Sequence, residues 1–508
     1  MFIYSLALFG LHAELVSVET DISPGLRAFH MVGLPDLAVK ESKERIRSAI
    51  KNTGLVFPRT RVTVNLAPAH LKKQGPAFDL SIALSILLAQ GEIPYEAIKK
   101  TLFMGELGLH GELRPVSGCL IGAIFAKEKS FQRLIIPKQN FEEASLIKQI
   151  QVYPVQTLRE MIDDLKGIKP LDFQKPAIRK NKQVVLSSII DFSDIKGQEH
   201  AKRGLEIAAA GSHNIILFGP PGSGKTLLAR ALPSLLPPLS QEESLEVTKI
   251  SSITGNFKNT QGLIQNPPFR SPHHSSSATA LIGGGAWPEP GEVTMAHRGV
   301  LFLDELPEFS RFALEHLRQP LEDGFVSISR TLARVTFPAR FLLVAAMNPC
   351  PCGYATDPTH HCTCSRHAIL KYLRKISGPL LDRIDLCIPV PKVETEKLLK
   401  KTLEVASSQF LKSVYGARRI QYKRFRASGH FTNAEMSPKE LEMFCLIDDE
   451  SQKLMKIATE KLSLSARGYT RVLKIARTIA DLAQSQSILA HHLSEALTYR
   501  PGIEIFTK

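Results

Sequence analysis

The segment 219–226, GPPGSGKT, constrains the fold of this chain more than any other feature. It matches the pattern G-x-x-x-x-G-K-[ST] and lies between an apolar run, NIILFG (214–219), and a helical run, TLLARALPSLL (226–236). Backbone N–H groups of such a loop surround phosphate oxygens at a helix N-terminus. We expect Lys225 to reach the β- and γ-phosphates and Thr226 to hold Mg²⁺. The expected nucleotide-binding residues are Gly219, Pro220, Pro221, Gly222, Ser223, Gly224, Lys225 and Thr226.

Two further apolar runs end in polar residues that suit the same nucleotide site. GVLFLDEL (299–306) carries Asp304 and Glu305 near its end, and RFLLVAAMN (340–348) ends in Asn348. Ligands of open α/β sheets sit at the carboxyl ends of the strands. We expect Asp304 to hold Mg²⁺, Glu305 to activate the attacking water, and Asn348 to orient that water. The alternative for Asn348 is a turn-forming residue at a strand end.

The apolar runs predict an α/β multidomain fold. Continuous apolar strands with helical stretches between them are typical of a parallel sheet that helices cover on both faces. At 508 residues the chain is too long for one ordinary core. We divide it into an α+β domain over 1–165, a Lys- and Pro-rich linker over 166–190, a parallel-sheet ATPase core over 191–390 and a helical domain over 391–508.

Composition narrows the choice of partners. The chain has a net charge of +15 and a sequence pI near 9.4, which suits either a solvated basic surface or a polyanionic partner.

No run reaches the ~18 consecutive apolar residues of a membrane helix, so we expect no membrane partner. The start, MFIYSLALFGLHAELV, has no basic n-region and predicts a buried first strand rather than a signal peptide. Cys119, Cys387 and Cys445 are scattered in apolar contexts, which suits reduced thiols in the cytoplasm.

Four cysteines gather within residues 350–364, CPCGYATDPTHHCTC, as two C-x-C pairs. Four thiolates on one loop are unfavourable unless they are bonded, and we expect zinc, with disulfides or free thiols as alternatives. His360 and His361 lie between the pairs and could replace a cysteine as ligand. Because the loop follows Asn348 directly, it either staples the fold or transmits the nucleotide state. The expected metal ligands are Cys350, Cys352, Cys362 and Cys364.

One segment mixes basic and aromatic residues in a way that suits nucleic acid. The stretch KSVYGARRIQYKRFRASGH (412–430) would bind single strands by charge and base stacking. The alternative is that its aromatic residues, at helical spacing, pack in the core. The residues concerned are Arg418, Arg419, Lys423, Arg424, Arg426, Tyr415, Tyr422 and Phe425.

The order of the motifs resembles that of AAA+ ATPases, with the phosphate loop, the Asp-Glu strand, the strand ending in Asn and then GPLLDRIDL (378–386). The resemblance implies that Arg383 is an arginine finger that reaches a neighbouring subunit's ATP in a ring, most simply a hexamer. The alternative for Arg383 is an ion pair with Asp382 or Asp385. SARGYTR (465–471) resembles the sensor-2 segment of the magnesium-chelatase and MCM branch, which implies a role for Arg467 or, alternatively, Arg471.

The segment DGFVSISRTLARVTFPARF (323–341) reads as two β runs around SRTLAR. It precedes the Asn348 strand, where related ring helicases place a hairpin that faces the pore. This resemblance implies that Arg330 and Arg334 near the tip contact DNA phosphates. The alternative is an ordinary exposed hairpin.

Four longer runs resemble the ComM/YifB family of magnesium-chelatase-like ATPases: APAHLKKQGPAFDL (67–80), PHHSSSATALIGGG (272–285), PGEVTMAHRGVLFLDELPEF (290–309) and MNPCPCG (347–353). The resemblance spans nearly the whole chain. It implies a cytoplasmic, hexameric, ATP- and Mg²⁺-dependent DNA helicase that promotes branch migration during natural transformation. Single-stranded and branched DNA would be its partners, and recombination proteins are further candidates. The rival reading is an AAA+ motor that remodels a protein, as a metal-chelatase subunit or a chaperone-like ATPase does.

The first domain resembles the proteolytic domain of Lon through KKQGPAFDLSIALSI (72–86) and FMGELGLHGELRPVSG (103–118). The resemblance places Ala77 at the position of the nucleophilic serine and Leu120 at the position of its lysine base. A Ser-Lys dyad needs a hydroxyl and an amine within hydrogen-bond reach, and neither residue supplies one. We therefore expect a Lon-like domain without peptidase chemistry, and an ATP-dependent protease is the least favoured function.

Overall fold

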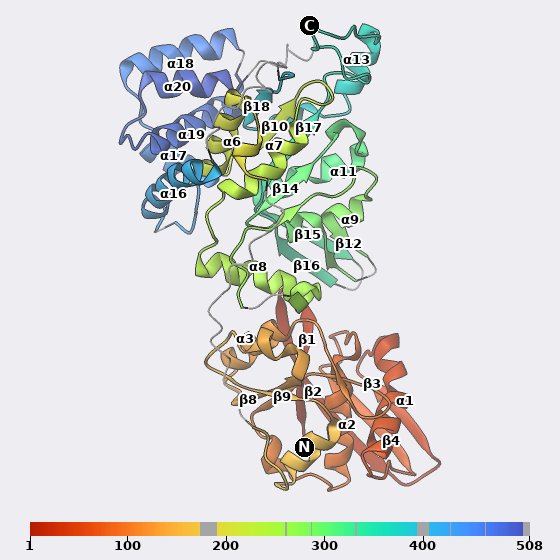
Figure 1. The fold of residues 1–508 in the computed structure, drawn as a ribbon. Helices are drawn as coiled ribbons and strands as arrows, with labels where there is room; N and C mark the ends of the chain where they lie inside the picture. Colours follow the sequence, from red (N-terminus) through yellow and green to blue (C-terminus); the bar gives the residue numbers. More distant parts are fainter. Residues whose placement is uncertain are drawn as a thin grey trace. The chain divides into compact units, whose positions relative to one another are not determined.

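The structure, a computed structural model, describes residues 1–172, 190–259, 262–285, 287–330, 333–393, 406–426, 428–462 and 464–500 (Figure 1). Most of the predicted linker 166–190 lies outside these ranges. The chain forms two compact units. Unit 1 consists of Met1–Val184, Ser244–Ile264 and Ser329–Val335, and unit 2 of Val185–Glu243, Gln265–Ile328 and Thr336–Lys508.

Unit 1 is built on a seven-stranded mixed sheet with the strand order β3-β4-β2-β1-β5-β8-β9. Strand β1 pairs antiparallel with β2 on one side and parallel with β5 on the other. Because β1 begins at Ile3 and buries both Ile3 and Leu6, the predicted buried first strand is confirmed. The strands are β1 (Ile3–Phe9), β2 (His12–Ser23), β3 (Ala28–Val32), β4 (Arg61–Ala67), β5 (Thr101–Phe103), β8 (Arg133–Pro137) and β9 (Gln151–Val155), with a separate pair β6 (Glu106–Leu107) and β7 (Leu113–Arg114).

Helix α2 (Asp79–Ala89) is the central helix of unit 1, and every residue from Asp79 to Leu88 is buried. The hydroxyls of this helix donate hydrogen bonds to backbone carbonyls. Ser81 donates to the carbonyl of Phe103, and Ser85 donates to the carbonyl of Ile82. Both serines are therefore buried hydroxyls of a core helix. The other helices of the N-terminal stretch are α1 (Leu37–Asn52), α3 (Cys119–Glu128), α4 (Phe141–Ala144) and α5 (Leu158–Leu165).

A segment that the sequence places within the ATPase core belongs to unit 1. Residues 244–264 include most of helix α8 (Gln241–Ile253). The buried hydroxyl of Ser252 donates to the buried carboxylate of Glu143, and the carbonyl of Ser252 accepts from the N–H of Gly118 at 3.1 Å. These contacts fix residues 244–264 within the same unit as residues 118–143.

Unit 2 contains a five-stranded parallel sheet with the order β11-β14-β17-β10-β18, which confirms the predicted parallel-sheet core. The three apolar runs form its central strands, and all their residues are buried. The strands are β10 (Ile215–Phe218), β11 (Phe269–Arg270), β14 (Val300–Leu303), β17 (Leu342–Met347) and β18 (Leu386–Pro389). Two strand pairs are separate from this sheet: β12 (Gly283–Gly284) with β13 (Glu289–Pro290), and β15 (Phe325–Arg330) with β16 (Ala333–Pro338). The second pair is divided between the units, because Ser329–Val335 belongs to unit 1.

The C-terminal part of unit 2 is helical, as predicted. Its helices are α16 (Ser407–Arg424), α17 (Pro438–Phe444), α18 (Asp449–Lys461), α19 (Ala466–Leu482) and α20 (Ala490–Thr498). The helices that precede them in this unit are α6 (Glu199–Gly211), α7 (Lys225–Ala231), α9 (Ala278–Ile282), α10 (Glu292–Met295), α11 (Arg311–His316), α12 (Arg318–Asp323), α13 (Arg366–Leu373) and α14 (Gly378–Leu381). Of the helices in the described part of the chain, none is long and apolar enough to span a membrane.

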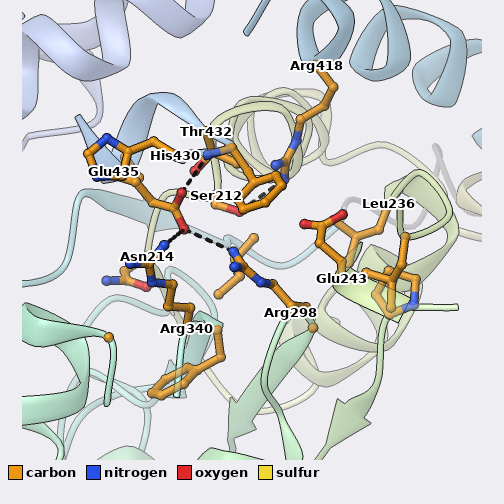
Figure 2. Close-up of a pocket in the computed structure, with 18 of the residues that line it drawn as sticks. Ser212, Asn214, Leu236, Glu243, Arg298, Arg340, Arg418, His430, Thr432 and Glu435 are labelled. Carbon is orange, nitrogen blue, oxygen red and sulfur yellow. Dashed lines mark hydrogen bonds and ion pairs between the residues drawn. The ribbon is translucent and has the colours of Figure 1, made fainter. Parts of the chain in front are cut away.

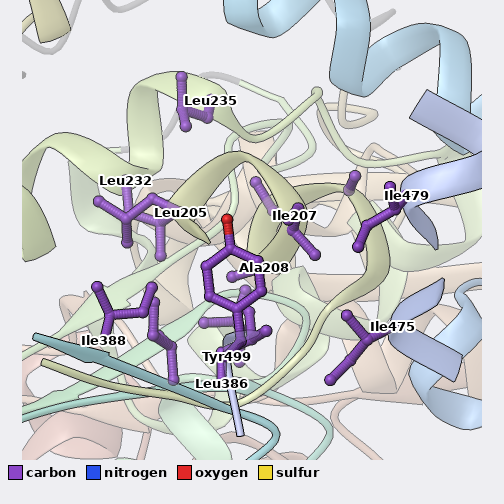
Figure 3. Packing of buried hydrophobic residues seen from close by; sticks show 14 of the residues in the cluster. Leu205, Ile207, Ala208, Leu232, Leu235, Leu386, Ile388, Ile475, Ile479 and Tyr499 are labelled. Carbon is purple, nitrogen blue, oxygen red and sulfur yellow. The ribbon is translucent and has the colours of Figure 1, made fainter. Parts of the chain in front are cut away.

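One hydrophobic core joins the parallel sheet of unit 2 to the C-terminal helices. Figure 3 shows Tyr499 among Leu205 and Ile207 of α6 and Ile388 of β18, with Ile475 of α19 in the same cluster. Burial raises the pKa of Tyr499 to about 12. The helical region is therefore packed on the ATPase sheet through α6 and is not a separate body.

Candidate functional site

The phosphate-binding motif lies where the sequence places it, between β10 and α7. Gly219 follows β10, and a Cβ at this position would lie 2.1 Å from the carbonyl oxygen of Val390, so only glycine fits. The ammonium of Lys225 is buried and donates to the carbonyls of Gly219 and Pro220 at 2.8 Å each. Burial lowers the pKa of Lys225, and the nearby carboxylate of Asp304 opposes that effect. Lys225 therefore reaches back along the loop in the position that a phosphate ligand requires.

The expected magnesium ligands meet at this loop. Thr226 is the second residue of α7, Asp304 follows β14, and the Thr226 hydroxyl donates to the Asp304 carboxylate at 2.9 Å. A hydroxyl and a carboxylate oxygen beside a phosphate loop suit Mg²⁺, which takes one or two protein ligands and completes its shell with water and phosphate. The residues present therefore fit a Mg–nucleotide complex.

Glu305 occupies a strained turn directly after Asp304. Its φ of 51° is left-handed, and its N–H donates to the Asp304 carboxylate at 3.0 Å. Such conformations in residues other than glycine persist mainly at functional sites. The Glu305 side chain is 55% exposed and lies 3.5 Å from Nδ1 of His274. We did not predict a role for His274, although it lies in the run 272–285 that resembles the ComM/YifB family.

Asn348 follows β17, and β17 lies between β14 and β10 in the sheet. In the register of the sheet, Met347 is opposite Phe218, the residue before the phosphate loop. The strand order thus brings Asn348 between Asp304 and the phosphate loop, as its expected role requires.

The four cysteines of the insertion converge. All four sulfur atoms lie within 4.8 Å of one another. The Sγ atom of Cys362 lies 3.7 Å from that of Cys350 and 3.5 Å from that of Cys352, and the latter two are 3.3 Å apart. A tetrahedral zinc site with Zn–S distances of about 2.3 Å has sulfur–sulfur edges of about 3.8 Å, whereas a disulfide needs about 2 Å. The sulfur arrangement fits a tetrahedral metal site.

The histidines of this loop lie outside the sulfur cluster. His360 lies 3.4 Å from the carboxylate of Asp357, which the ammonium of Lys392 approaches to 2.5 Å. Among the residues that the structure describes, the group with metal-ligand geometry contains only the four cysteines. The alternative in which His360 replaces a cysteine therefore has no support in the geometry.

The cysteine loop touches the phosphate loop. A Cβ on Gly353, whose φ is +88°, would lie 2.6 Å from the ring of Pro221. The ion pair between Asp357 and Lys392 also ties the loop to the residues after β18, a neighbour of β10. A rigid cysteine loop would therefore support the phosphate loop from its side. The sequence carried no signal of the contact between Gly353 and Pro221.

The predicted arginine finger, Arg383, and the predicted sensor-2 residue, Arg467, share one carboxylate. Arg383 is only 4% exposed and donates to Glu322 of α12 and to the carbonyl of Pro379. The same carboxylate accepts from Arg467 at 2.8 Å. Arg383 thus pairs with Glu322, and not with Asp382 or Asp385. We did not predict a role for Glu322.

Arg471, the alternative to Arg467, has a different partner. It lies 3.0 Å from the buried carboxylate of Asp385, which also lies 3.6 Å from His213. Burial opposes ionisation of Asp385, but Arg471 and His213 outweigh it and hold the pKa of this carboxyl well below its usual range. Arg471 therefore stabilises a buried charge, whereas the side chain of Arg467 is 59% exposed.

Arg383 lies at the opposite edge of the sheet from the phosphate loop of its own chain. Its carbonyl accepts from the Asn214 side chain, and Asn214 precedes β10, whereas the loop follows β10. The four residues of β10 span about 13 Å, which separates Arg383 from the phosphate loop.

A cavity of about 710 Å³ opens at the amino ends of the strands of this sheet, and Figure 2 shows Arg298 and Arg340 around Glu435 on its wall. This cavity therefore does not coincide with the nucleotide site.

The predicted DNA-contacting arginines lie on the β15–β16 hairpin, and both are exposed. The turn residues 331–332 lie outside the described part of the chain.

The positions that the Lon resemblance assigns to the protease dyad lie in unit 1. Ala77 packs beside the cluster that contains Leu102 and Met104, and Leu120 is fully buried in α3. Neither position presents a hydroxyl or an amine.

Comparison with known proteins extends along the whole chain. Three family models match it: magnesium chelatase, subunit ChlI, over residues 191–398; subunit ChlI of Mg-chelatase over 18–140; and magnesium chelatase, subunit ChlI C-terminal, over 404–500. The chain is 46% identical to competence protein ComM of Haemophilus influenzae over 510 residues, which cover 100% of this chain and 98% of that protein. The chain belongs to the ComM/YifB family. YifB of Escherichia coli is 43% identical over 499 residues, which cover 98% of this chain and 96% of that protein.

Membership of the ComM/YifB family makes this a magnesium-chelatase-like AAA+ protein, and that family implies ATP and Mg²⁺ as ligands. Part of the chain is also similar to a Lon protease. Lon protease 2 of Bacillus subtilis is 31% identical over 217 residues, which cover 41% of this chain and 35% of that protein. The fold class predicted from the sequence is confirmed.

The separate roles of Lys225 and Glu305 can be tested in the full chain. Lys225→Ala should abolish nucleotide binding because it removes the phosphate clamp. Glu305→Gln should bind ATP normally but hydrolyse it at least ~100-fold more slowly, because general-base catalysis contributes about that much. The measurements are binding of a fluorescent ATP analogue and steady-state phosphate release. Glu308→Gln, an exposed neighbour, is the matched control. Equal hydrolysis by Glu305→Gln and the control would refute the assignment.

The cysteine loop gives a second test. We expect one Zn²⁺ per chain by elemental analysis, and Cys350→Ser with Cys352→Ser should lose it. ATP should still bind because Lys225 and Thr226 are retained, but hydrolysis should respond less to DNA because the loop beside Pro221 loosens. Cys387→Ser, outside the loop, is the control and should keep its metal. Purified wild-type protein without zinc, and with four titratable thiols in the loop, would contradict the prediction.

Proposed function

We propose that this chain is an ATP-driven DNA helicase that promotes branch migration of recombination intermediates during natural transformation. The observation that carries the proposal is the full-length similarity to a protein named competence protein ComM. The exposed arginines of the β15–β16 hairpin and the charge of +15 support DNA as the partner. Cytoplasmic location and action on single-stranded and branched DNA belong to the same proposal.

Residues around the phosphate loop would carry out the hydrolysis. Lys225 holds the phosphates, while Thr226 and Asp304 hold Mg²⁺, which would neutralise charge on the transferred phosphoryl group. Glu305 takes a proton from the attacking water, and Asn348 orients that water. The contact between Thr226 and Asp304 and the position of Asn348 between the two neighbouring strand ends support these roles.

A ring, most simply a hexamer, would complete the nucleotide site. Arg383 and Arg467 meet on Glu322 at the sheet edge opposite the chain's own phosphate loop, so neither is placed to act on that site. In a ring, the same two arginines can face the nucleotide of the next subunit. Arg383 would leave Glu322 to reach it, and Glu322 would retain Arg467 as a partner.

The cysteine loop would bind zinc and couple the nucleotide site to the rest of the ring. The fit of the four sulfur atoms to tetrahedral geometry supports the metal, and the approach of Gly353 to Pro221 supports the coupling. A purely structural zinc site is the alternative, and the retention of DNA-stimulated hydrolysis in the cysteine variants would distinguish it.

An AAA+ motor that remodels a protein is the second candidate. The family models that match most of the chain are those of a magnesium-chelatase subunit. A protein remodeller would hydrolyse ATP at the same rate with and without DNA, whereas a DNA motor would be stimulated by DNA. Proteolysis has no support, since Ala77 and Leu120 occupy the positions of the dyad.

The action of Arg383 across subunits predicts complementation. Arg383→Ala should assemble but hydrolyse ATP poorly, as should Glu305→Gln. Mixed rings should recover part of the activity, because some interfaces then pair an intact Arg383 with an intact Glu305. The measurement is phosphate release over a range of mixing ratios, with each parent protein alone as control. Mixed rings verified by native mass spectrometry that remain inactive at every ratio would exclude the trans role.

Unwinding should depend on the hairpin. Arg330→Ala with Arg334→Ala should abolish strand separation and leave basal hydrolysis unchanged, because the hairpin lies outside the nucleotide site. Affinity for single-stranded DNA should fall with salt, and the double variant should reduce the slope of log K against log[salt] by about 1.4. Lys453→Ala with Lys456→Ala, which removes two exposed charges from α18, is the control. Normal unwinding by the arginine variant would remove the hairpin from the mechanism.

A further inference from the structure

Helix α16 (Ser407–Arg424) is unusual in its charge. Its sequence, SSQFLKSVYGARRIQYKR, contains five cationic residues and no carboxylate. An isolated surface helix commonly alternates charges because pairs of opposite sign three or four residues apart stabilise it. The positive charge of α16 is therefore not balanced within the helix itself.

The inner face of α16 and the loop after it account for part of this charge. Arg418 donates to the carbonyl of Ala209 at 2.8 Å, and Arg424 forms a double hydrogen bond with the buried Asp481. Phe425 is buried in the core. These residues hold α16 against α6 and α19, and the core interpretation of the aromatic residues is correct for Phe425.

The outer face is different. Tyr415 is 57% exposed and Tyr422 is 59% exposed, so the core interpretation is wrong for both tyrosines. They are seven residues apart, which separates them by about 10 Å along one side of the helix. Large aromatic side chains exposed to this extent mark interaction surfaces when polar residues surround them.

Exposed cations surround the two tyrosines at helical spacing. Together they form a basic–aromatic row of Lys412, Tyr415, Arg419, Tyr422, Lys423 and Arg426. Within the described part of the chain, no side chain of the row forms a hydrogen bond or an ion pair. The arginines of this segment are thus of two kinds: those on the inner face are satisfied by the protein, and those of the row are free.

Three residues of the row also line a cavity. Tyr415, Arg419 and Tyr422 line the cavity at the amino-end edge of the sheet, where Figure 2 shows Arg418 on the wall. The row therefore combines a helix surface with an adjoining concave wall, and not a flat surface alone.

We propose that the basic–aromatic row binds single-stranded DNA, an inference that rests on the proposed action on DNA. The four cations contact phosphates, and the rings of Tyr415 and Tyr422 stack on bases. Stacking requires unpaired bases, so the row favours single strands over duplex DNA. Two exposed lysines argue against the core of a protein–protein interface, from which lysine is depleted.

The test uses the full-length protein and a fluorescein-labelled dT 30-mer, with anisotropy measured over a range of salt concentrations. Tyr415→Ala with Tyr422→Ala should weaken binding at least about 5-fold without changing the salt slope, since stacking carries no counterion release. The matching phenylalanine double variant should bind like wild type. Arg419→Ala with Lys423→Ala should reduce the salt slope by about 1.4. Lys453→Ala with Lys456→Ala is the control, and basal ATP hydrolysis should not change in any of them.

The outcomes separate this inference from the proposed function. If wild-type protein binds no DNA, the proposed function fails. If it binds, and the tyrosine-to-alanine variant matches the control, only the row is excluded. An equal loss of duplex binding, or a change of ring mass in native mass spectrometry without a change in DNA affinity, would also overturn the row as a single-strand site. Crosslinking of an iodouracil-substituted oligonucleotide to wild-type protein should label a peptide within 412–426, and labelling elsewhere alone would contradict the proposal.

Discussion

The pairing of β10 with β17 and β18 is the constraint on which the rest of unit 2 depends. Together with the pairing of β14 with β17, it places the phosphate loop, Asp304 and Asn348 at the carboxyl ends of neighbouring parallel strands. The same pairing places Asn214 and Arg383 at the other ends of these strands. Because the strands of a parallel sheet all point the same way, its two ends differ chemically. The residues of the nucleotide site lie at the carboxyl ends of the strands, and Arg383 lies at the amino ends.

The C-terminal helices depend on the same sheet. Their apolar residues share one core with β18 and α6, and Tyr499 lies within it. This packing determines which side of α16 is covered. Arg418 and Arg424 are satisfied inside, so the opposite side, with its two tyrosines, remains accessible. The chemistry of the outer face is thus a consequence of how the inner face is anchored.

The cysteine loop joins the sheet at the nucleotide edge. It begins after Asn348, touches the phosphate loop through Gly353 and Pro221, and is tied to the end of β18 through Asp357 and Lys392. A small loop has no core of its own, and four cysteines brought within 4.8 Å offer a metal site in its place. Its stiffness would therefore bear directly on residues that surround the phosphates.

The sequence by itself determined the features that depend on local chemistry: the strand–loop–helix around Lys225, the apolar strands that end in Asp304 and Asn348, and the helical C-terminal region. These follow from periodicity and turn chemistry over a few residues. Only the tertiary structure decided the partner of Arg383, the contact of Gly353 with Pro221, and the exposure of Tyr415 and Tyr422. Periodicity shows which side chains share a face of a helix, but packing against distant segments decides whether that face is covered. Glu322 lies 61 residues from Arg383 in the chain, and no local pattern links them.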